Sequence, residues 1–132
     1  MAALLGTDIV IHLRDGDGWS RSQARTLDPP LYLSAISRVE LENGVWRDPA
    51  LTATRRAALD ALLPQFVVLA FGPDEIDAYA AILAETGYSR RKVADRMTAA
   101  TALMQDLPLV TLNGRDFRDI PALSLIEWER PE

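Results

Sequence analysis

Short apolar runs separate longer segments in which apolar residues recur at helical spacing. The first run, residues 3–11, is interrupted at Gly6 and Asp8, which predicts a short buried strand that ends near those two residues. A later run at 66–71 is continuous and β-branched, as buried parallel strands are. The further predicted strands span residues 31–36, 66–71, 109–112 and 123–128.

Helical patterns fill the intervals between the predicted strands. Ser34 or Ser37 is available to cap the second helix, and Pro73 opens a later helix that Gly87 closes. The predicted helices span residues 20–27, from the serine cap to about 47, 51–65, 73–87 and about 92–106. Because strands alternate with helices, we expect a mainly parallel sheet with helices on both faces, an α/β fold. The length of 132 residues favours one compact domain over 1–132.

Composition excludes several classes of site. The chain has no cysteine, so disulfides and thiolate zinc sites are impossible, and its one histidine, His12, argues against a histidine-rich metal cage. His12 follows an apolar run, and we interpret it as a packing or surface residue. No apolar run approaches the roughly 18 residues of a membrane span, and the N-terminus lacks the pattern of a signal peptide. We therefore expect a cytoplasmic protein without a membrane partner.

The net charge of −5 is unusual for a protein that binds nucleic acid, because phosphate contacts rest on Lys and Arg. A cluster of carboxylates balanced by bound cations would account for much of the acidic excess. Basic residues also gather at Arg90, Arg91 and Lys92, which is usually only a solvated face. Charge alone leaves a nucleic-acid partner open.

Acidic residues recur where predicted strands end or helices begin. Asp8 follows the first strand, Glu40 the second, Asp95 starts a helix, and Asp116 follows the fourth strand. In a parallel sheet ligands bind beyond the carboxyl ends of the strands, so these acids are placed to converge. Oxygen ligands of this kind suit hard divalent cations such as Mg²⁺ or Mn²⁺.

Each acid also has a purely structural interpretation. Glu40 lies three residues after Ser37 and fits a capping box, while Asp8 fits a helix N-cap. Asp95 lies in a first helical turn, where the helix dipole favours a carboxylate, and Asp116 fits a turn. Asp119, by the same reasoning, is a turn residue. Only the joint placement at one edge raises the odds of a shared site.

The helix that carries Asp95 has two distinguishable faces. The predicted apolar stripe consists of Val93, Met97, Ala100, Thr101 and Met104. Asp95 lies off this stripe together with small side chains at positions 98, 99 and 102, which permits close approach to the sheet edge. This face suits a buried or half-buried site, although a solvated N-terminal Asp fits equally well.

Four segments together resemble the PIN-domain ribonucleases, specifically the VapC-like toxins of bacterial toxin–antitoxin pairs. They are LLGTDIVI, SRVELENGV, VADRMTAATAL and LVTLNGRDF, and the last three match in order and at family-like separations. The resemblance covers essentially the whole chain. It implies an α/β/α sandwich whose acidic pocket binds Mg²⁺ or Mn²⁺ and cuts RNA. It also implies a small VapB-like antitoxin as partner and a homodimer, for which Trp46 and Tyr79 are candidate contacts.

Carried over by position, the resemblance makes Glu40, Asp95 and Asp116 the acidic site residues, with Asn113 a polar residue beside them. The first acid of the family falls on Gly6, which offers no ligand oxygen except its backbone carbonyl. Asp8 shares a strand face with position 6 if the strand continues, so it could partly substitute. Natural divergence and deliberate inactivation both explain Gly6, and either should weaken metal binding and activity.

Three functions compete on this evidence. The first is a metal-dependent ribonuclease toxin, in which Arg90, Arg91 and Lys92 form a phosphate-positioning patch and Gly6 reduces activity. The second is a non-catalytic PIN-like module that has lost its metal and only binds a partner or RNA. The third, a phosphate-receiving regulatory domain, would need a lysine near the last strands, and the only lysine, Lys92, precedes a helix.

Overall fold

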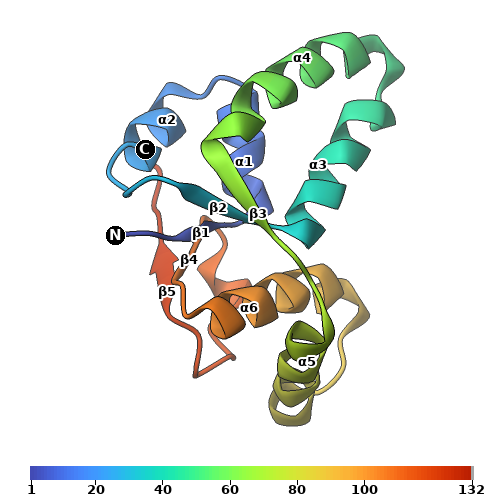
Figure 1. The fold of residues 1–132 in the computed structure, drawn as a ribbon, viewed down its shortest axis with the longest axis vertical. Helices are drawn as coiled ribbons and strands as arrows, with labels where there is room; N and C mark the ends of the chain where they lie inside the picture. The colour runs from blue at the N-terminus through green and yellow to red at the C-terminus, as the bar shows by residue number, and fades with distance from the viewer. Residues whose placement is uncertain (132) are drawn as a thin grey trace.

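The computed structural model describes residues 1–131, and its central feature is a five-stranded sheet in the order β3-β2-β1-β4-β5 (Figure 1). All neighbouring strands are parallel. The strands are β1 (Leu4–Leu5), β2 (Leu31–Ser34), β3 (Phe66–Leu69), β4 (Leu109–Thr111) and β5 (Leu125–Glu127). The predicted α/β architecture is therefore confirmed, and the strands lie where the apolar runs placed them.

The helices form two layers, one on each face of the sheet. Figure 1 shows α1–α4 on one side and α5 and α6 on the other. The helices are α1 (Thr7–Arg14), α2 (Gly18–Ala24), α3 (Ala35–Arg47), α4 (Thr52–Leu62), α5 (Pro73–Thr86) and α6 (Val93–Gln105). Short 3-10 helices are η1 (Pro49–Leu51), η2 (Leu63–Gln65), η3 (Arg90–Lys92) and η4 (Gly114–Asp116).

The alternation of side chains along the central strand divides the core in two. Leu5 points into the cluster beneath α1, α3 and α4, and Leu4 points into the cluster beneath α5 and α6. Both leucines are fully buried. A strand of only two residues thus contributes to both core layers, and the chain is free to turn into α1 directly afterwards.

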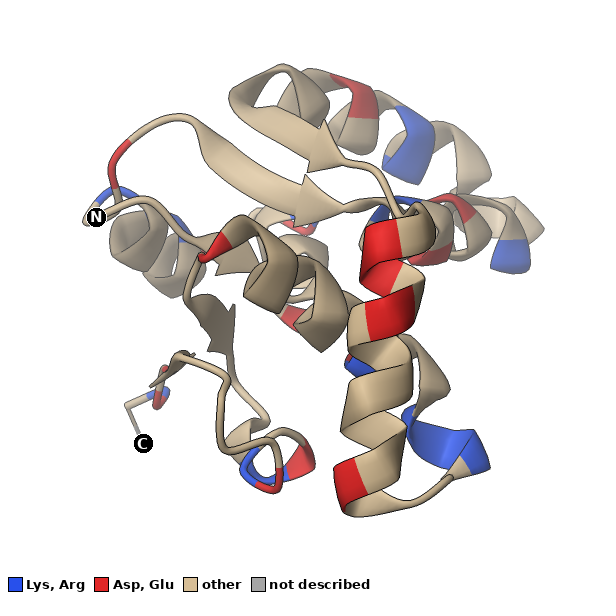
Figure 2. Ribbon diagram, turned by 60° about the horizontal axis from the view of Figure 1, so that its bottom comes forward, with Lys and Arg blue, Asp and Glu red and all other residues tan. Residues whose placement is uncertain are grey.

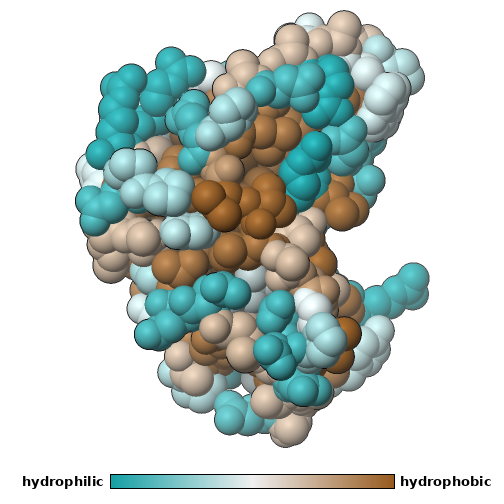
Figure 3. All heavy atoms as spheres, viewed as in Figure 1, coloured by the Kyte–Doolittle hydropathy of each residue, from teal (hydrophilic) through white to brown (hydrophobic). Residues whose placement is uncertain are grey.

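Two expectations about burial are wrong. The run at 66–71 was expected to be a buried strand, but β3 lies at the edge of the sheet, where Val67 and Val68 are 43% and 46% exposed. Figure 3 shows a hydrophobic area at the centre of the face that Figure 1 presents, where β3 lies. A continuous apolar run does not distinguish a central strand from an edge strand that presents an apolar surface.

The second correction concerns Met104 of α6, which was assigned to the apolar stripe but is 43% exposed. The small side chains that share a face with Asp95, at positions 98, 99 and 102, are buried, in agreement with the expected close approach to the sheet. Small side chains let α6 approach the sheet closely, so the face that carries the acid is packed rather than solvated.

Among the helices of residues 1–131, none combines the length and apolar character that a bilayer crossing requires.

Candidate active site

The topology brings the four acidic positions to one edge of the sheet. Asp8 lies in the first turn of α1 after β1, Glu40 lies in α3 after β2, and Asp116 ends η4 after β4. Strands β2, β1 and β4 are adjacent and parallel, so their carboxyl ends share an edge. Asp95 lies in the first turn of α6 and approaches the same edge from the helical layer formed by α5 and α6.

Electrostatics show that these carboxylates interact. Burial raises the pKa of Asp95 to about 6, and repulsion from Asp116, Glu40 and Asp8 contributes to the rise, in that order of effect, while Arg91 opposes it. Asp95 therefore lies among carboxylates whose negative charge the nearby Arg91 only partly offsets. This mutual repulsion indicates that the four carboxylates belong to one candidate site.

Asp8 is held by the end of β4 and is not a helix N-cap. Its Oδ2 accepts hydrogen bonds from the backbone N–H of Leu112 at 2.9 Å and the hydroxyl of Thr111 at 3.2 Å. The N-cap of α1 is instead Gly6, which has no side chain to cap with. Asp8 thus ties the start of α1 to the neighbouring strand and stands at the sheet edge.

Gly6 contributes no ligand oxygen. Its carbonyl oxygen accepts hydrogen bonds from the N–H groups of Ile9 and Val10 in α1, at 3.1 and 3.3 Å. The one oxygen that Gly6 could offer to a metal is therefore already used within the helix. The backbone at Gly6, with φ −66° and ψ 157°, is one that any L-residue adopts. Nothing in the local conformation requires glycine at this position.

A chain of hydroxyl groups positions Glu40. Thr7 Oγ1 lies 2.7 Å from both Glu40 Oε1 and Ser37 Oγ. Ser37 Oγ lies 3.1 Å from Ser34 Oγ, which in turn lies 3.2 Å from Thr98 Oγ1 on α6. The four hydroxyls connect the starts of α1 and α3 to α6, and three of them are buried.

The capping box of Ser37 and Glu40, the structural alternative for Glu40, does not form. The cap of α3 is Ser34, whose hydroxyl accepts the N–H of Ser37 at 3.0 Å, so Glu40 is free to bind Thr7. Sequence reasoning had assigned no role to Thr7 or Thr111. Both are hydroxyl residues at the ends of strands next to the acids, a signal that could have identified them.

Asp116 borders a polar hollow of about 540 Å³ lined by Arg91, Lys92, Asn113, Arg115 and Asp116. Arg91 lies 3.8 Å from Asp116 and is 75% exposed, so its guanidinium is available to a ligand. Figure 2 shows the basic η3 segment next to α5, a helix that carries acids alone. Arg115 was not predicted.

The other predicted basic residues are less well placed. Lys92 lies 3.7 Å from Asp119 and its side chain is only 19% exposed, while Arg90 does not line the hollow. Asp119, expected only to form a turn, is also 3.2 Å from Arg96. The lone histidine, His12, lies in the last turn of α1, at the end opposite Asp8.

The carboxylates as they stand are not a finished chelating group. Within residues 1–131, no three acidic or histidine side chains are close enough to hold a metal ion together. Their oxygen chemistry and unbalanced charge nonetheless suit a hard divalent cation.

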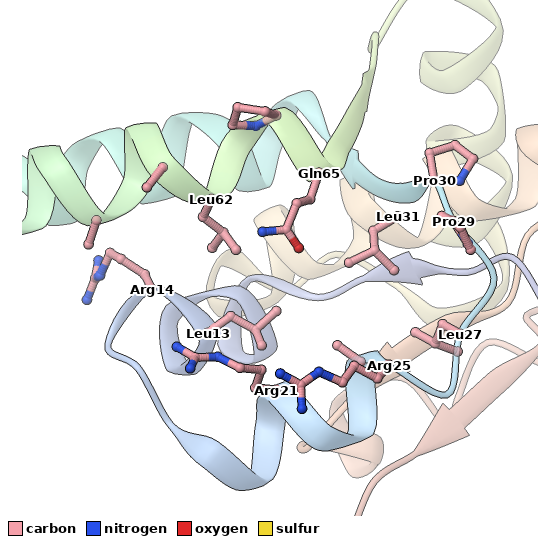
Figure 4. Close-up of a pocket in the computed structure, with 14 residues that line it drawn as sticks. Leu13, Arg14, Arg21, Arg25, Leu27, Pro29, Pro30, Leu31, Leu62 and Gln65 are labelled. Carbon is pink, nitrogen blue, oxygen red and sulfur yellow. The ribbon is translucent and has the colours of Figure 1, made fainter.

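A larger hollow, of about 1070 Å³, lies at the opposite edge of the sheet (Figure 4). Its lining includes the apolar side chains of Leu13, Leu31 and Leu62, together with the exposed Arg21 and Arg25 and the buried Arg14. No acidic residue lines it, so its size does not make it a candidate for metal chemistry.

Comparison with known proteins agrees with this architecture. The family model for the PIN domain matches residues 3–123. The chain belongs to the PIN-domain family. Two relatives are "Ribonuclease VapC" of Rickettsia bellii, 32% identical, and "Ribonuclease VapC1" of Rickettsia felis, 31% identical, each aligned over 96% of both chains.

A solved structure shares the whole fold. VapBC2 from Rickettsia felis, bound to a DNA fragment from its promoter, has a TM-score of 0.85 and 23% identity over 98% of this chain and 100% of that one. The resemblance to VapC-like PIN-domain proteins, based on four short segments, is confirmed. In this PIN domain, the acids that carried that resemblance are the ones gathered around Asp95.

Proposed function

We propose that this PIN domain is a metal-dependent ribonuclease, the toxin of a toxin–antitoxin pair, that hydrolyses RNA phosphodiester bonds. The observation that carries the proposal is the placement of Asp8, Glu40, Asp95 and Asp116 at one edge of the sheet, where the other three charges help to raise the pKa of Asp95. Relatives that align over nearly the whole chain are named ribonuclease VapC, which supports the same activity.

Asp95, Asp116, Asp8 and Glu40 would hold Mg²⁺ or Mn²⁺. A bound cation supplies an activated water and stabilises negative charge on the phosphate. The chain itself orients these oxygens: Thr7 fixes Glu40, and the β4 terminus fixes Asp8. Position 6 supplies no side-chain oxygen. We therefore expect weaker metal binding and slower cleavage than in a site with a further carboxylate at this position.

RNA would approach from the side of η3 and η4. Arg91 and Arg115 line the hollow beside Asp116, whereas α5 carries four acids and no basic residue. Phosphates are attracted to the first surface and repelled by the second. Two residues of the predicted phosphate-positioning patch are less well placed to bind RNA. Lys92 is paired with Asp119, and Arg90 does not line the hollow.

Two protein partners belong to the same proposal. A VapB-like antitoxin would fill the acidic groove, with an Arg near the carboxylates.

A second copy of the chain would cover the exposed apolar residues at β3 and α3, where Trp46 is 63% exposed. Tyr79 packs against the core cluster beneath α5 and α6, so it is a poorer candidate than Trp46 for a dimer contact. Sedimentation would show a dimer that Val68→Lys dissociates; a monomer at every concentration would reject this interface.

The non-catalytic binding module is the second candidate, favoured by Gly6 and by the lack of a three-ligand group in residues 1–131. Mn²⁺ binding and cleavage of a mixed-sequence RNA distinguish the two. A nuclease should cleave in Mn²⁺, stop with EDTA, and lose at least about 100-fold in rate in Asp95→Asn. RNA binding without Mn²⁺ uptake or cleavage would favour the module.

Asp106→Asn is the matched control for Asp95→Asn. Asp106 is an exposed acid at the other end of α6, in a left-handed conformation that Asn adopts readily. Its replacement removes the same charge from the same helix and should leave cleavage unchanged. Equal loss in both variants would place the effect in overall charge rather than at the site.

A further inference from the structure

Arg96 of α6 is a buried arginine that binds two segments outside its own helix. The residue is only 2% exposed. Its Nη1 donates a hydrogen bond to the carbonyl oxygen of Gly87 at 2.5 Å, and its Nη2 donates to Asp119 Oδ2 at 3.2 Å. Gly87 ends α5, and Asp119 lies in the loop after η4. One guanidinium group therefore joins two stretches of chain that are more than thirty residues apart.

The two segments that Arg96 joins are the ones that line the polar hollow beside Asp116. The lining residues of this hollow come from η3 and from η4 together with the preceding Asn113. Gly87 lies three residues before η3, and Asp119 lies three residues after η4. Arg96 binds just outside both walls of the hollow, so its position affects the distance between them.

The two walls differ in how they are anchored to the rest of the protein. The loop after β4 is fixed to the core by three buried apolar side chains, those of Phe117, Ile120 and Leu123. By contrast, none of residues 87–92 is buried. Arg96 gives this segment a contact to a buried side chain at its start, and Lys92 adds an ion pair with Asp119 at 3.7 Å at its end. The basic wall is thus held by polar contacts rather than by the core.

Core stability alone does not account for an arginine at position 96. Within residues 1–131, its Nε is the buried side-chain nitrogen or oxygen that has no hydrogen-bond partner. An unpaired buried N–H group costs free energy, and so does the removal of a charge from water. A methionine would fill similar space without either cost. The distinctive contribution of the guanidinium is therefore its pair of hydrogen bonds to Gly87 and Asp119.

We propose that Arg96 is a positioning residue that holds the η3 segment at a fixed distance from the η4 loop, so that the two walls of the hollow are preset for an RNA phosphate. The proposal rests on the proposed function, because RNA is the ligand that it assigns to this hollow. Arg91 and Arg115 contact the phosphate, while Arg96 is buried and acts through the segments that carry them. Preset walls reduce the entropy that RNA binding loses in ordering the η3 segment.

The first test measures the distance between the two walls without RNA. Because the chain has no cysteine, spin labels attached to Arg90→Cys and Ala122→Cys are specific. Both positions are exposed, and neither lines the hollow. The distance between the labels should have a narrow distribution when Arg96 is present and a broader one in Arg96→Met, because the η3 segment loses its bond to α6. Identical distributions would overturn the proposal.

The second test separates RNA binding from chemistry and from stability. In Arg96→Met, the KM for a mixed-sequence RNA should rise about fivefold, while kcat changes by less than about twofold. Mn²⁺ affinity should stay the same, because Arg91 is the cation that acts on Asp95. Tm should change by less than about 3 °C, because the buried charge and its unpaired N–H leave together. An unchanged KM, or a fall in kcat that follows a fall in Tm, would overturn the proposal.

Arg14→Met is the matched control for Arg96→Met. Arg14 is also a buried arginine, but it lies on α1 and pairs with the adjacent Asp15 at 3.0 Å. Its replacement should leave the label distances and the KM unchanged, and an equal effect would show general loosening instead of positioning. Arg96→Lys keeps the charge but lacks the planar fork that reaches two acceptors, so its KM should lie between those of the wild type and Arg96→Met.

Arg96→Gln serves if Arg96→Met fails to fold. Its amide can bind one of the two acceptors of Arg96 but is too short to bridge both, so the label distances should again broaden, and unchanged distances would contradict the proposal. If the wild type neither binds nor cleaves RNA in Mn²⁺, the proposed function fails. The label distances then decide separately whether Arg96 sets the spacing of the two walls.

Discussion

Replacing Asp95 by Asn should stabilise the metal-free protein at neutral pH. The pKa of Asp95 is raised to about 6, from burial first and neighbouring carboxylates second, so the charged form is disfavoured in the folded state. A difference of about two between the folded and unfolded pKa values corresponds to about 3 kcal/mol. Partial exposure of Asp95 and the favourable dipole of α6 reduce this, and we expect a net gain of about 1–2 kcal/mol.

The pH dependence of this gain follows from the direction of the pKa shift. Because the folded pKa lies above the unfolded value of 3.8, the folded state binds more protons between about pH 4 and pH 6. Wild-type stability therefore falls as pH rises through that window. The advantage of Asn should be complete above about pH 7 and disappear near pH 4, where Asp95 in the folded protein is protonated.

Thermal unfolding in EDTA measures the effect. At pH about 7.5 the variant should unfold roughly 5 °C above the wild type, and Asp106→Asn should show no comparable gain. Saturating Mn²⁺ should reverse the order, because the cation stabilises only the protein that retains its ligands. An equal or lower Tm for Asp95→Asn at that pH without metal would refute the idea that burial and the neighbouring carboxylates disfavour the charged form of Asp95.

Three further variants test other parts of the structure. Ser34→Ala removes the cap of α3 and leaves the Ser37 N–H unpaired, so urea unfolding should show a loss of about 1–2 kcal/mol, against no change for the exposed Ser22→Ala. Gly114→Ala places a Cβ against the Glu127 side chain and should cost about 1–2 kcal/mol, and Glu127→Ala should relieve that cost; an alanine that is fully tolerated in the wild type would contradict the packing. Arg115→Gln should weaken RNA binding several-fold and lower the salt dependence by about 0.7 in log–log slope, unlike Arg47→Gln at the end of α3. An unchanged salt slope would place the RNA elsewhere.

Element order and the position of the acids were predictable because both follow from local patterns. Apolar runs located all five strands, and the alternation with helices implied a parallel sheet whose carboxyl edge collects Asp8, Glu40 and Asp116. The place of β3 at the edge was not predictable. Which strands become neighbours depends on contacts far apart in the chain, and an exposed Val68 has the same sequence signature as a buried one.

The partners of the acids were likewise beyond local reasoning. Asp8 receives its hydrogen bonds from residues more than a hundred positions later, and Glu40 from Thr7. A capping box was the best local account of Glu40, and it failed because Ser34 begins α3 three residues before the assumed cap. Interactions between distant segments decide which of several locally acceptable roles a polar residue takes.

The central strand ends one residue before the chain turns into α1, and that intervening residue carries no part of the core. Leu4 and Leu5 are fully buried in the two core clusters, while a Cβ at position 6 would meet the Asp8 carboxylate and the carbonyl oxygen of Val110. A change of residue at position 6 therefore alters the acidic edge without removing a hydrophobic side chain from either core cluster. The chemistry of this edge can vary while the packing that holds the sheet together stays the same.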